Sequence, residues 1–414
     1  MEYGCIGKTL KHSFSAEIHP MLSEADYRLC EVAEEELDAF MTARDFRGIN
    51  VTIPYKKAVI PYLCELDPAA KAIGAVNTIV NRQGRLYGYN TDFYGMCALL
   101  EHIKADLKNK KVAILGTGGT SLTAQAVAHH LGAREILTVS REKKAGCITY
   151  AELTEAHRDV EILINTTPVG MYPNADAVPV EPSLFPRLQA VADAVYNPLR
   201  TELVLRAEAC GAVAEGGLFM LVAQAVRAAE IFHECEYPAG TAERIWKRMM
   251  RKKENIVLVG MPGSGKTTVG RLLAEELERV FCDTDEEIRL SDCRAPSEIL
   301  QAEGETAFRD LESRVLQERV AYRTGEIIAT GGGAILRQEN VRMLRRNGRL
   351  YFLDRPLERL IPTADRPLSS SREMLEKRYR ERYDLYCRCA DLRIFDPETA
   401  EEAAKAIEKE FLSE

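Results

Sequence analysis

Two glycine-rich loops of different spacing, each between an apolar strand-like run and a helical run, constrain what this chain can fold into. The first, ILGTGGTS, places glycines at Gly116, Gly118 and Gly119, and the second, LVGMPGSGKTT, runs as GxxxxGK[ST] from Gly260 to Thr267. Such loops occur where a strand turns sharply into a helix, and the unpaired N–H groups at that helix start bind phosphate. The two loops therefore predict two nucleotide-binding units of α/β class.

Length and composition limit the class of protein further. A chain of 414 residues is too long for one core and predicts two or three domains. Its formal net charge of −8 argues against nucleic acid as the main partner. No apolar run approaches the ~18 residues of a membrane span, and the N-terminus lacks the order of a secretory signal. The 11 scattered cysteines indicate reduced thiols, so we expect a cytoplasmic protein without a membrane partner.

Alternating strand-like and helical runs divide the chain. Before residue 95 the strand candidates are GINVTIP, GAVNTIV and RLYGYNTD, and further on they are VAILG, REILTVS, EILINTT and AVADAVY. The charged run at 247–255 precedes a restart of the alternation with NIVLVG, VFCDTD, GEIIATGGG, GRLYFLD and LRIFD. Strands that alternate with helices predict doubly wound parallel sheets. We therefore predict a substrate lobe at 1–96, completed by a helix near 218–248, a Rossmann lobe at 97–217 and a third domain at 254–414.

The first loop has dinucleotide spacing, with Ser121 in place of the third glycine. It lies in the strand, helix, strand context that this fingerprint requires. The second strand of this unit is the run REILTVS, and an acidic residue at its end would indicate binding of NAD. Ser140, Arg141 and Lys144 stand there instead. These groups suit the 2′-phosphate of NADP, whereas a solvated basic turn is the alternative. The cofactor-binding residues predicted in the loop itself are Gly116, Thr117, Gly118, Gly119, Thr120 and Ser121.

The second loop has the spacing of a triphosphate-binding loop. Lys266 is expected to neutralise the β and γ phosphates of ATP and Thr267 to bind Mg²⁺. The residues predicted to hold the nucleotide are Gly263, Ser264, Gly265, Lys266, Thr267 and Thr268.

The segments GCIGKTLKHSFSAEIHP, GINVTIPYK, GAVNT, GYNTDFYG, INTTPVGM, DAVYNPLRTEL and GGLFMLVAQA occur in this order. Together they resemble shikimate dehydrogenase over residues 1 to about 245. The resemblance implies that Lys56 transfers a proton to the reacting oxygen and that Asp92 orients Lys56 and shares that oxygen. It also implies that Ser13 and Ser15 bind the substrate carboxylate. The residues implied to hold the ring hydroxyls are Thr52, Asn77, Asp92 and Gln224.

The same resemblance places Gly217 and Met220 at the cofactor. Phe219 departs from the family, which usually has glycine there, and its bulk is expected beside the nicotinamide pocket. His12 and His19 are interpreted as structural histidines, since no third ligand is spaced for zinc.

In the last part of the chain, CDTDEEI, ETAFRDLE, ATGGGA, TADRPL and RERYDLYCR resemble shikimate kinase across residues 254 to 414. The resemblance implies that Asp283 helps Thr267 hold Mg²⁺ and that Asp285 accepts the proton of the attacking hydroxyl. It implies further groups for the acid substrate, namely Arg309, Arg382, Gly331, Gly332 and Gly333. Arg366 is expected in a lid over the transferring phosphate and Arg359 against adenine. Glu312 is expected to orient Arg309, with an ordinary surface ion pair as the alternative.

The two resemblances converge on one molecule, because such a dehydrogenase makes shikimate from 3-dehydroshikimate and such a kinase phosphorylates it. We therefore interpret the chain as a bifunctional, monomeric enzyme of aromatic amino acid biosynthesis that uses NADP(H), ATP and Mg²⁺. The kinase half is expected to have the P-loop fold of nucleoside monophosphate kinases. The alternatives are a quinate/shikimate dehydrogenase fused to another small-molecule kinase, acting for instance on gluconate or a nucleotide, and a non-catalytic nucleotide-binding sensor.

Overall fold

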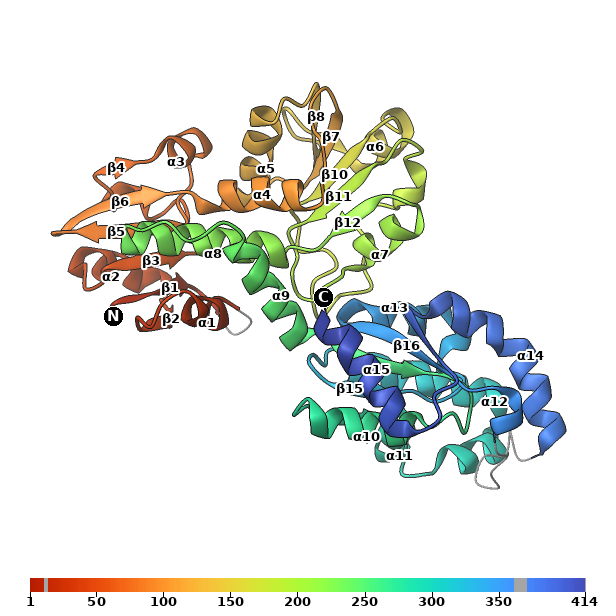
Figure 1. Ribbon diagram of the computed structural model, residues 1–414. Helices are drawn as coiled ribbons and strands as arrows, with labels where there is room; N and C mark the ends of the chain where they lie inside the picture. Colours follow the sequence, from red (N-terminus) through yellow and green to blue (C-terminus); the bar gives the residue numbers. More distant parts are fainter. Residues whose placement is uncertain (11–13, 361–370, 414) are drawn as a thin grey trace. The chain divides into compact units, whose positions relative to one another are not determined.

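The computed structural model describes residues 1–10, 14–360 and 371–413 (Figure 1). The predicted site residues Ser13 and Arg366, and also His12, lie outside these ranges. The chain divides into two compact units, Met1–Lys247 and Arg248–Glu414. Among the described residues, no helix has the length and apolar character needed to cross a membrane. All eleven cysteines fall within the described ranges and are unpaired thiols.

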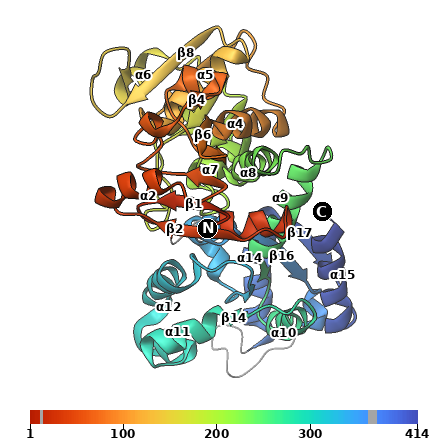
Figure 2. The same ribbon diagram turned by 90° about the vertical axis from the view of Figure 1, so that its left-hand side faces the viewer.

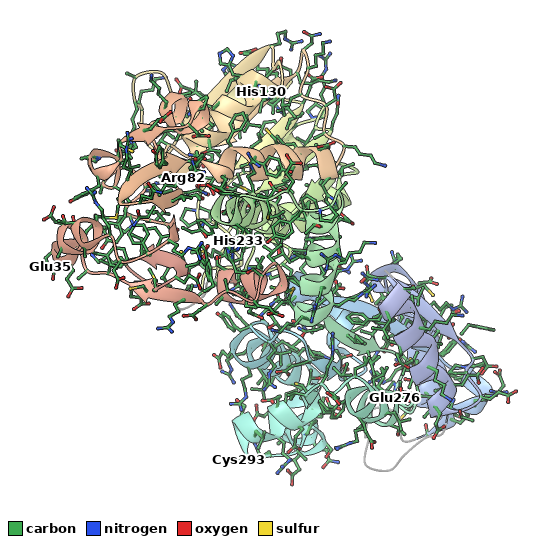
Figure 3. The ribbon with its side chains drawn as sticks, turned by 60° about the vertical axis from the view of Figure 1, so that its left-hand side comes forward. Glu35, Arg82, His130, His233, Glu276 and Cys293 are labelled. Atoms are coloured by element: carbon green, nitrogen blue, oxygen red, sulfur yellow. The ribbon has the colours of Figure 1, made fainter. Side chains whose placement is uncertain are left out.

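The first lobe of the first unit is built on a mixed sheet with strand order β2-β1-β3-β5-β6-β4. Strand β5 is antiparallel to both of its neighbours, β3 and β6. The strands of this sheet are β1 (Tyr3–Gly7), β2 (Tyr27–Glu31), β3 (Gly48–Val51), β4 (Glu65–Leu66), β5 (Thr78–Arg82) and β6 (Arg85–Tyr89). The helices of this part are α1 (Ser15–Ile18), α2 (Leu37–Ala43), α3 (Pro68–Ile73) and α4 (Thr91–His102). Glu35, in the turn before α2, is exposed at the edge of the molecule (Figure 3).

The second lobe has a wholly parallel sheet with strand order β12-β11-β10-β7-β8-β9. Its strands are β7 (Lys111–Leu115), β8 (Glu135–Ser140), β9 (Ile148–Thr149), β10 (Ile162–Asn165), β11 (Ala190–Asp193) and β12 (Val213–Glu215). Its helices are α5 (Gly119–His130), α6 (Tyr150–Ala156) and α7 (Glu202–Ala209). The central strands are largely apolar and buried on both faces, as expected for a parallel sheet covered by helices.

Helix α8 (Leu218–His233) returns from the second lobe to the first and lies against its sheet (Figure 1). Its Phe232 packs on Tyr3 with ring centroids 5.3 Å apart. The sequence predicts one helix near 218–248, but the structure has two, α8 and α9 (Thr241–Lys253). The break follows from Glu234 and Gly240, which both adopt positive φ, and from Pro238 between them, because these conformations cannot continue a helix.

The second unit has a parallel sheet with strand order β14-β15-β13-β16-β17. Its strands are β13 (Asn255–Val259), β14 (Phe281–Asp283), β15 (Ile327–Ala329), β16 (Gly348–Asp354) and β17 (Leu392–Phe395). Its helices are α10 (Lys266–Glu276), α11 (Thr284–Asp292), α12 (Pro296–Val315), α13 (Gln338–Asn347), α14 (Arg372–Cys389) and α15 (Ala400–Ser413). Helices α10 and α15 lie side by side on one face, where Val269 and Leu273 share a core with Ile407 and Phe411 (Figure 2). The α/β class predicted from the sequence is confirmed.

Phe219, whose bulk is expected beside the nicotinamide pocket, is a core residue. Its side chain is only 7% exposed. The ring stacks on His102 of α4, with centroids 4.0 Å apart, and meets Trp246 of α9 edge-on at 5.9 Å. Phe219, on α8, therefore packs against both α4 and α9 within the first unit.

Truncating Phe219 to Ala is expected to lower the free energy of unfolding of the first unit by about 3–5 kcal/mol, because a buried ring is replaced by a cavity. Trp246 is the only tryptophan of the chain, so its fluorescence during urea unfolding reports on this packing directly. The matched control is Phe395→Ala, whose ring in the second unit is 66% exposed. Equal shifts of the Trp246 transition in both variants would contradict the assignment of Phe219 to the core.

Candidate functional sites

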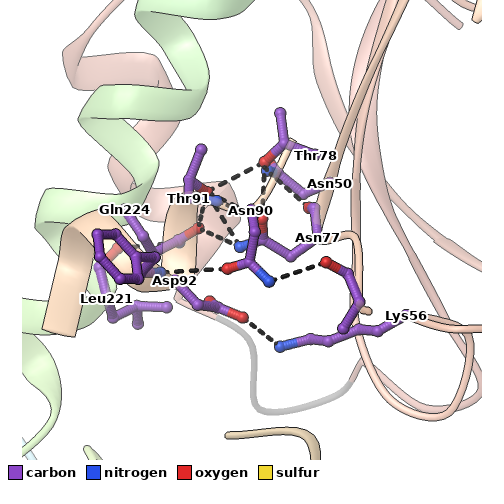
Figure 4. Close-up of polar contacts among 11 residues, drawn as sticks. Asn50, Lys56, Asn77, Thr78, Asn90, Thr91, Asp92, Leu221 and Gln224 are labelled. Carbon is purple, nitrogen blue, oxygen red and sulfur yellow. Dashed lines mark hydrogen bonds and ion pairs between the residues drawn. The ribbon is translucent and has the colours of Figure 1, made fainter. Parts of the chain in front are cut away.

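An ion pair joins Lys56 and Asp92 in the first lobe (Figure 4). Lys56 lies in the loop after β3, and Asp92 lies in the first turn of α4, which Asn90 caps by accepting from the Phe93 N–H at 3.1 Å. The Lys56 Nζ donates to Asp92 Oδ2 at 2.6 Å, and both side chains are largely buried. The pair therefore holds an ammonium group in a fixed position inside the fold.

The predicted residues Asn77 and Gln224 lie in the same polar cluster, together with Thr91 (Figure 4). Asn77 Oδ1 accepts from the Thr91 backbone N–H at 2.7 Å, and Asn77 Nδ2 donates to Thr91 Oγ1 at 3.0 Å. Gln224, on α8, accepts from the Thr91 hydroxyl at 3.2 Å. Residues from the start of β5, from α4 and from α8 are thus brought together, although they are far apart in the sequence.

A buried chain of hydrogen bonds that the sequence does not reveal continues from this cluster to Ser15. Asn50 Nδ2 donates to Thr78 Oγ1 at 3.1 Å, and the Tyr27 hydroxyl donates to Asn50 Oδ1 at 2.8 Å. Tyr27 also bonds Ser15, the first residue of α1. The available signal is Asn50 itself, a polar residue within the apolar strand β3. Thr52 follows β3 and is held by its N–H, which donates to the Ile6 carbonyl at 3.0 Å.

His19 is a buried residue that contacts two members of this chain of hydrogen bonds, Tyr27 and Asn50. Its ring stacks on Tyr27 with centroids 3.7 Å apart and bonds Asn50, whereas its Nε2 is buried with no hydrogen-bond partner among the described residues. Burial, together with repulsion from His233, lowers the pKa of His19 to about 3. His19 is therefore neutral in the folded protein at neutral pH.

The first glycine loop joins β7 to α5 in the predicted manner. Gly116 has φ +108°, and a Cβ there would lie 2.9 Å from Thr166 Oγ1, so glycine is required. Gly118 and Gly119 face open space at the start of α5, and Thr117 is also exposed. Exposed N–H groups at a helix start have the geometry that binds phosphate in other proteins. The remaining loop residues complete the first turn of α5, namely Thr120 and the buried Ser121.

The end of β8 carries the predicted NADP-binding residues. Ser140 is buried as the last residue of the strand, while Arg141 and Lys144 are exposed. Lys143 is paired with Glu152 at 2.5 Å, whereas no described carboxylate forms an ion pair with Arg141 or Lys144.

Gly217 and Met220 lie at the start of α8, where a Cβ on Gly217 would lie 2.3 Å from the Ala194 carbonyl oxygen.

The second glycine loop joins β13 to α10. Gly263 and Gly265 adopt positive φ, and Lys266 begins the helix with its Nζ bonded to the Gly260 and Met261 carbonyls at 2.9 and 3.0 Å. Thr267 Oγ1 donates to Asp283 Oδ2 at 3.0 Å, so the two predicted metal-binding oxygens are neighbours. Ser264 is buried within the loop, and Thr268 follows on α10.

One cavity of about 970 Å³ unites this loop with the predicted acid-binding residues. Asp285 lies in the first turn of α11, after Asp283 caps that helix. Arg382 donates to the Gly332 carbonyl at 3.0 Å. The three glycines allow a close approach, because a Cβ on Gly331 would meet Asp285 at 2.7 Å, one on Gly332 would meet Pro262 at 2.9 Å and one on Gly333 would meet the Arg309 guanidinium. The lining residues predicted from the sequence are Asp285, Arg309, Gly331, Gly332, Gly333 and Arg382.

Arg309 is oriented by a buried ion pair, so the alternative of a surface pair is wrong. Its Nη1 donates to Glu312 Oε2 at 2.7 Å, and Glu312 is 1% exposed. Burial raises the pKa of Glu312, and Arg309 opposes this.

Arg359 is exposed and paired with Asp396 at 2.9 Å. Arg378, which is not among the predicted site residues, also lines the cavity. Its position four residues before Arg382 on one helix is the signal that could have indicated it.

These arrangements define a dinucleotide-binding unit followed by a P-loop unit. Residues 5–79 match the family model of the shikimate dehydrogenase substrate binding domain, and residues 262–412 match that of shikimate kinase. A shikimate dehydrogenase (NADP(+)) of Clostridium perfringens is 37% identical over 265 residues, which cover 60% of this chain and 97% of the relative. The chain therefore belongs to the shikimate dehydrogenase family and carries a shikimate kinase domain.

Solved structures agree with this assignment. Shikimate dehydrogenase 1 from Peptoclostridium difficile is 34% identical with a TM-score of 0.55, covering 60% of this chain and 98% of its own. Shikimate 5-dehydrogenase from Thermus thermophilus, in complex with NADP(H) and shikimate, is 29% identical with a TM-score of 0.55, covering 60% and 99%.

The low pKa of His19 predicts a loss of stability in acid. The unfolded chain binds a proton on His19 below the unfolded pKa of about 6.5, whereas the folded protein resists it down to about 3. Stability is therefore complete above pH 6.5 and falls as the pH drops toward 3. In His19→Phe, the slope of unfolding free energy against pH, measured by urea unfolding between pH 6 and 4, should be smaller by up to ~1.4 kcal/mol per pH unit. An unchanged slope would contradict the neutral, buried state of His19.

Proposed function

We propose that this chain carries out two successive reactions of the shikimate pathway. The first unit reduces 3-dehydroshikimate to shikimate with NADPH, and the second phosphorylates shikimate at its 3-hydroxyl with ATP. The substrate lobe is assigned to 1–96 with α8, the Rossmann lobe to 97–217 and the kinase domain to 254–414. The observation that carries the proposal is the cavity in which the P-loop, Asp285 and the arginines Arg309 and Arg382 meet, together with the Lys56–Asp92 pair. The chain is proposed to act as a monomer.

In the dehydrogenase unit, Lys56 is proposed as the proton donor. NADPH supplies a hydride when bound, and negative charge then develops on the substrate's ketone oxygen. A positioned ammonium group lowers the barrier by stabilising that charge and giving up a proton. Asp92 keeps the ammonium in place through the 2.6 Å bond. Asn77 and Gln224 offer amide groups to the ring hydroxyls, and Ser15, with Ser13, offers a hydroxyl to the carboxylate.

The kinase unit is proposed to act by positioning and charge. ATP with Mg²⁺ supplies the phosphoryl group when bound. Lys266 neutralises phosphate charge, and Asp285 accepts the proton of the attacking hydroxyl. Arg309 and Arg382 bind the carboxylate of the acid with planar forks of donors. Arg359 is proposed at the adenine and Arg366 at the phosphate.

The Mg²⁺ assignment rests on the donor set of the cavity. Magnesium prefers oxygen ligands and is usually held by one or two protein groups, waters and phosphate. The Thr267 hydroxyl and the Asp283 carboxylate lie 3.0 Å apart at the mouth of the P-loop and fit this preference. Among the described residues there is no cluster of three or more His, Cys, Asp or Glu side chains that could hold a metal ion, so a site made of protein ligands alone is not expected there.

Single substitutions should separate the two activities. Lys56→Met is expected to lower the rate of reduction about 10²–10⁴-fold, because the proton donor is lost, and to leave phosphorylation unchanged. Asp285→Asn should do the reverse. The assay supplies 3-dehydroshikimate, NADPH and Mg·ATP to the full chain and follows both products by mass spectrometry, with shikimate supplied separately to measure phosphorylation alone. If either change silenced both reactions, or if the wild-type chain formed neither product, the proposal would be wrong.

Cofactor choice should depend on Arg141. Arg141→Ala is expected to raise KM for NADPH about tenfold or more and to leave KM for NADH unchanged, because only NADPH carries the 2′-phosphate. The matched control is Lys143→Ala, since Lys143 already pairs with Glu152. If Arg141→Ala kept the preference for NADPH, the assignment of Arg141 to the 2′-phosphate would be wrong.

A further inference from the structure

Three arginines converge on the acid-binding end of the kinase cavity, and only two of them are assigned to the substrate. Arg309 comes from α12, whereas Arg378 and Arg382 lie one turn apart on α14. The side chain of Arg378 is 13% exposed, and Arg309 and Arg382 are buried. Burial lowers the pKa of Arg382, and repulsion from Arg378 and Arg309 lowers it further. Three guanidinium groups are thus close together at this end of the cavity, and Glu312 on Arg309 is one of the carboxylates that balance their charge.

A second carboxylate of the protein, that of Glu305, contacts all three arginines. Glu305 Oε1 lies 3.3 Å from Arg309 Nη2 and 3.7 Å from Arg382 Nη2, so one oxygen faces both substrate-binding arginines. The other oxygen, Oε2, lies 3.6 Å from Arg378 Nη2. Burial alone would raise the pKa of Glu305, but Arg378 and Arg309 lower it. Glu305 is thus a carboxylate in contact with the two arginines that the proposed function assigns to the substrate's carboxylate.

Glu305 differs from the other carboxylate on Arg309 in its freedom to move. Glu312 is 1% exposed and fixed by a 2.7 Å bond, whereas the side chain of Glu305 is 42% exposed and its contacts are longer. Two carboxylates on the same pair of guanidinium groups repel each other. A bound acid must therefore displace Glu305 and not Glu312, and Arg378 is the cation that already contacts its second oxygen.

We infer that Glu305 is a displaceable carboxylate that occupies the arginine pair until the acid substrate binds, and that Arg378 is the positioning residue that then holds it aside. This inference rests on the proposed kinase function. It also lets the site select acids over neutral alcohols. An alcohol without a carboxylate cannot displace Glu305, so Arg309 and Arg382 stay ion-paired. Neutral polyols are therefore disfavoured by charge.

The test uses the full chain with Arg378→Gln, Glu305→Gln and the double variant, and measures KM and kcat for shikimate at saturating Mg·ATP. Arg378→Gln should raise KM about tenfold with little change in kcat or in KM for ATP, because Glu305 then stays on the arginine pair. Glu305→Gln should lower KM, since the competing charge is gone. In the Glu305→Gln background, adding Arg378→Gln should change KM less than about twofold. Arg380→Gln, with the same loss of charge at an exposed position of α14, should behave as wild type.

Several outcomes would overturn the inference. If Arg378→Gln raised KM equally with and without the Glu305 charge, Arg378 would bind the substrate itself. If Glu305→Gln raised KM, Glu305 would support binding instead of opposing it, and this variant decides the matter even if Arg378→Gln fails to fold. If the wild type is active and either of these results is found, only the inference is wrong. If the wild type does not phosphorylate shikimate, both the proposed function and the inference are wrong.

Discussion

Parallel strands bring their carboxyl ends to one edge of a sheet, and the nucleotide sites of both units depend on this constraint. In the second lobe, Gly116 follows β7 and Ser140 ends β8, on neighbouring strands. In the second unit the P-loop follows β13, Asp283 ends β14 and Gly331 follows β15. Short motifs that are far apart in the chain therefore meet because each one directly follows a strand of the same sheet. The helices that start there add N–H groups to the same edge.

Within this frame, two of the charged groups proposed to act on substrate are held by an opposite charge. Lys56 is held by Asp92, and Arg309 by Glu312. Buried ion pairs add little to stability, because desolvation offsets their attraction; their value here is to fix the direction of a charged group. The contrast between Glu312 and Glu305 shows that the same arginine has one buried, closely bonded partner and one more exposed partner at longer distance.

Much of the fold could be predicted from local pattern. The central strands of both parallel sheets are continuous apolar runs, and their glycine loops have spacings with a known physical reason. The structure brings Lys56 and Asp92 together with Asn77 and Gln224, and it places Asp285 with Arg309 and Arg382. Two-residue strands such as β4 and β9 have no periodicity to detect. The break between α8 and α9 has a signal in Pro238 and Gly240, whereas the positive φ at Glu234, where α8 ends, has none in the sequence.

The amino-acid sequence by itself determined the class of each unit, the two phosphate-binding loops and the resemblance to two successive enzymes, because these depend on short contiguous runs. Only the tertiary structure decided that Phe219 packs on His102, that Tyr27 and Asn50 connect Ser15 to the Asn77 cluster, and that Glu305 occupies the arginine pair. These contacts join residues on different elements or select one rotamer among several. Their energies depend on burial and distance in three dimensions, which no pattern along the chain contains.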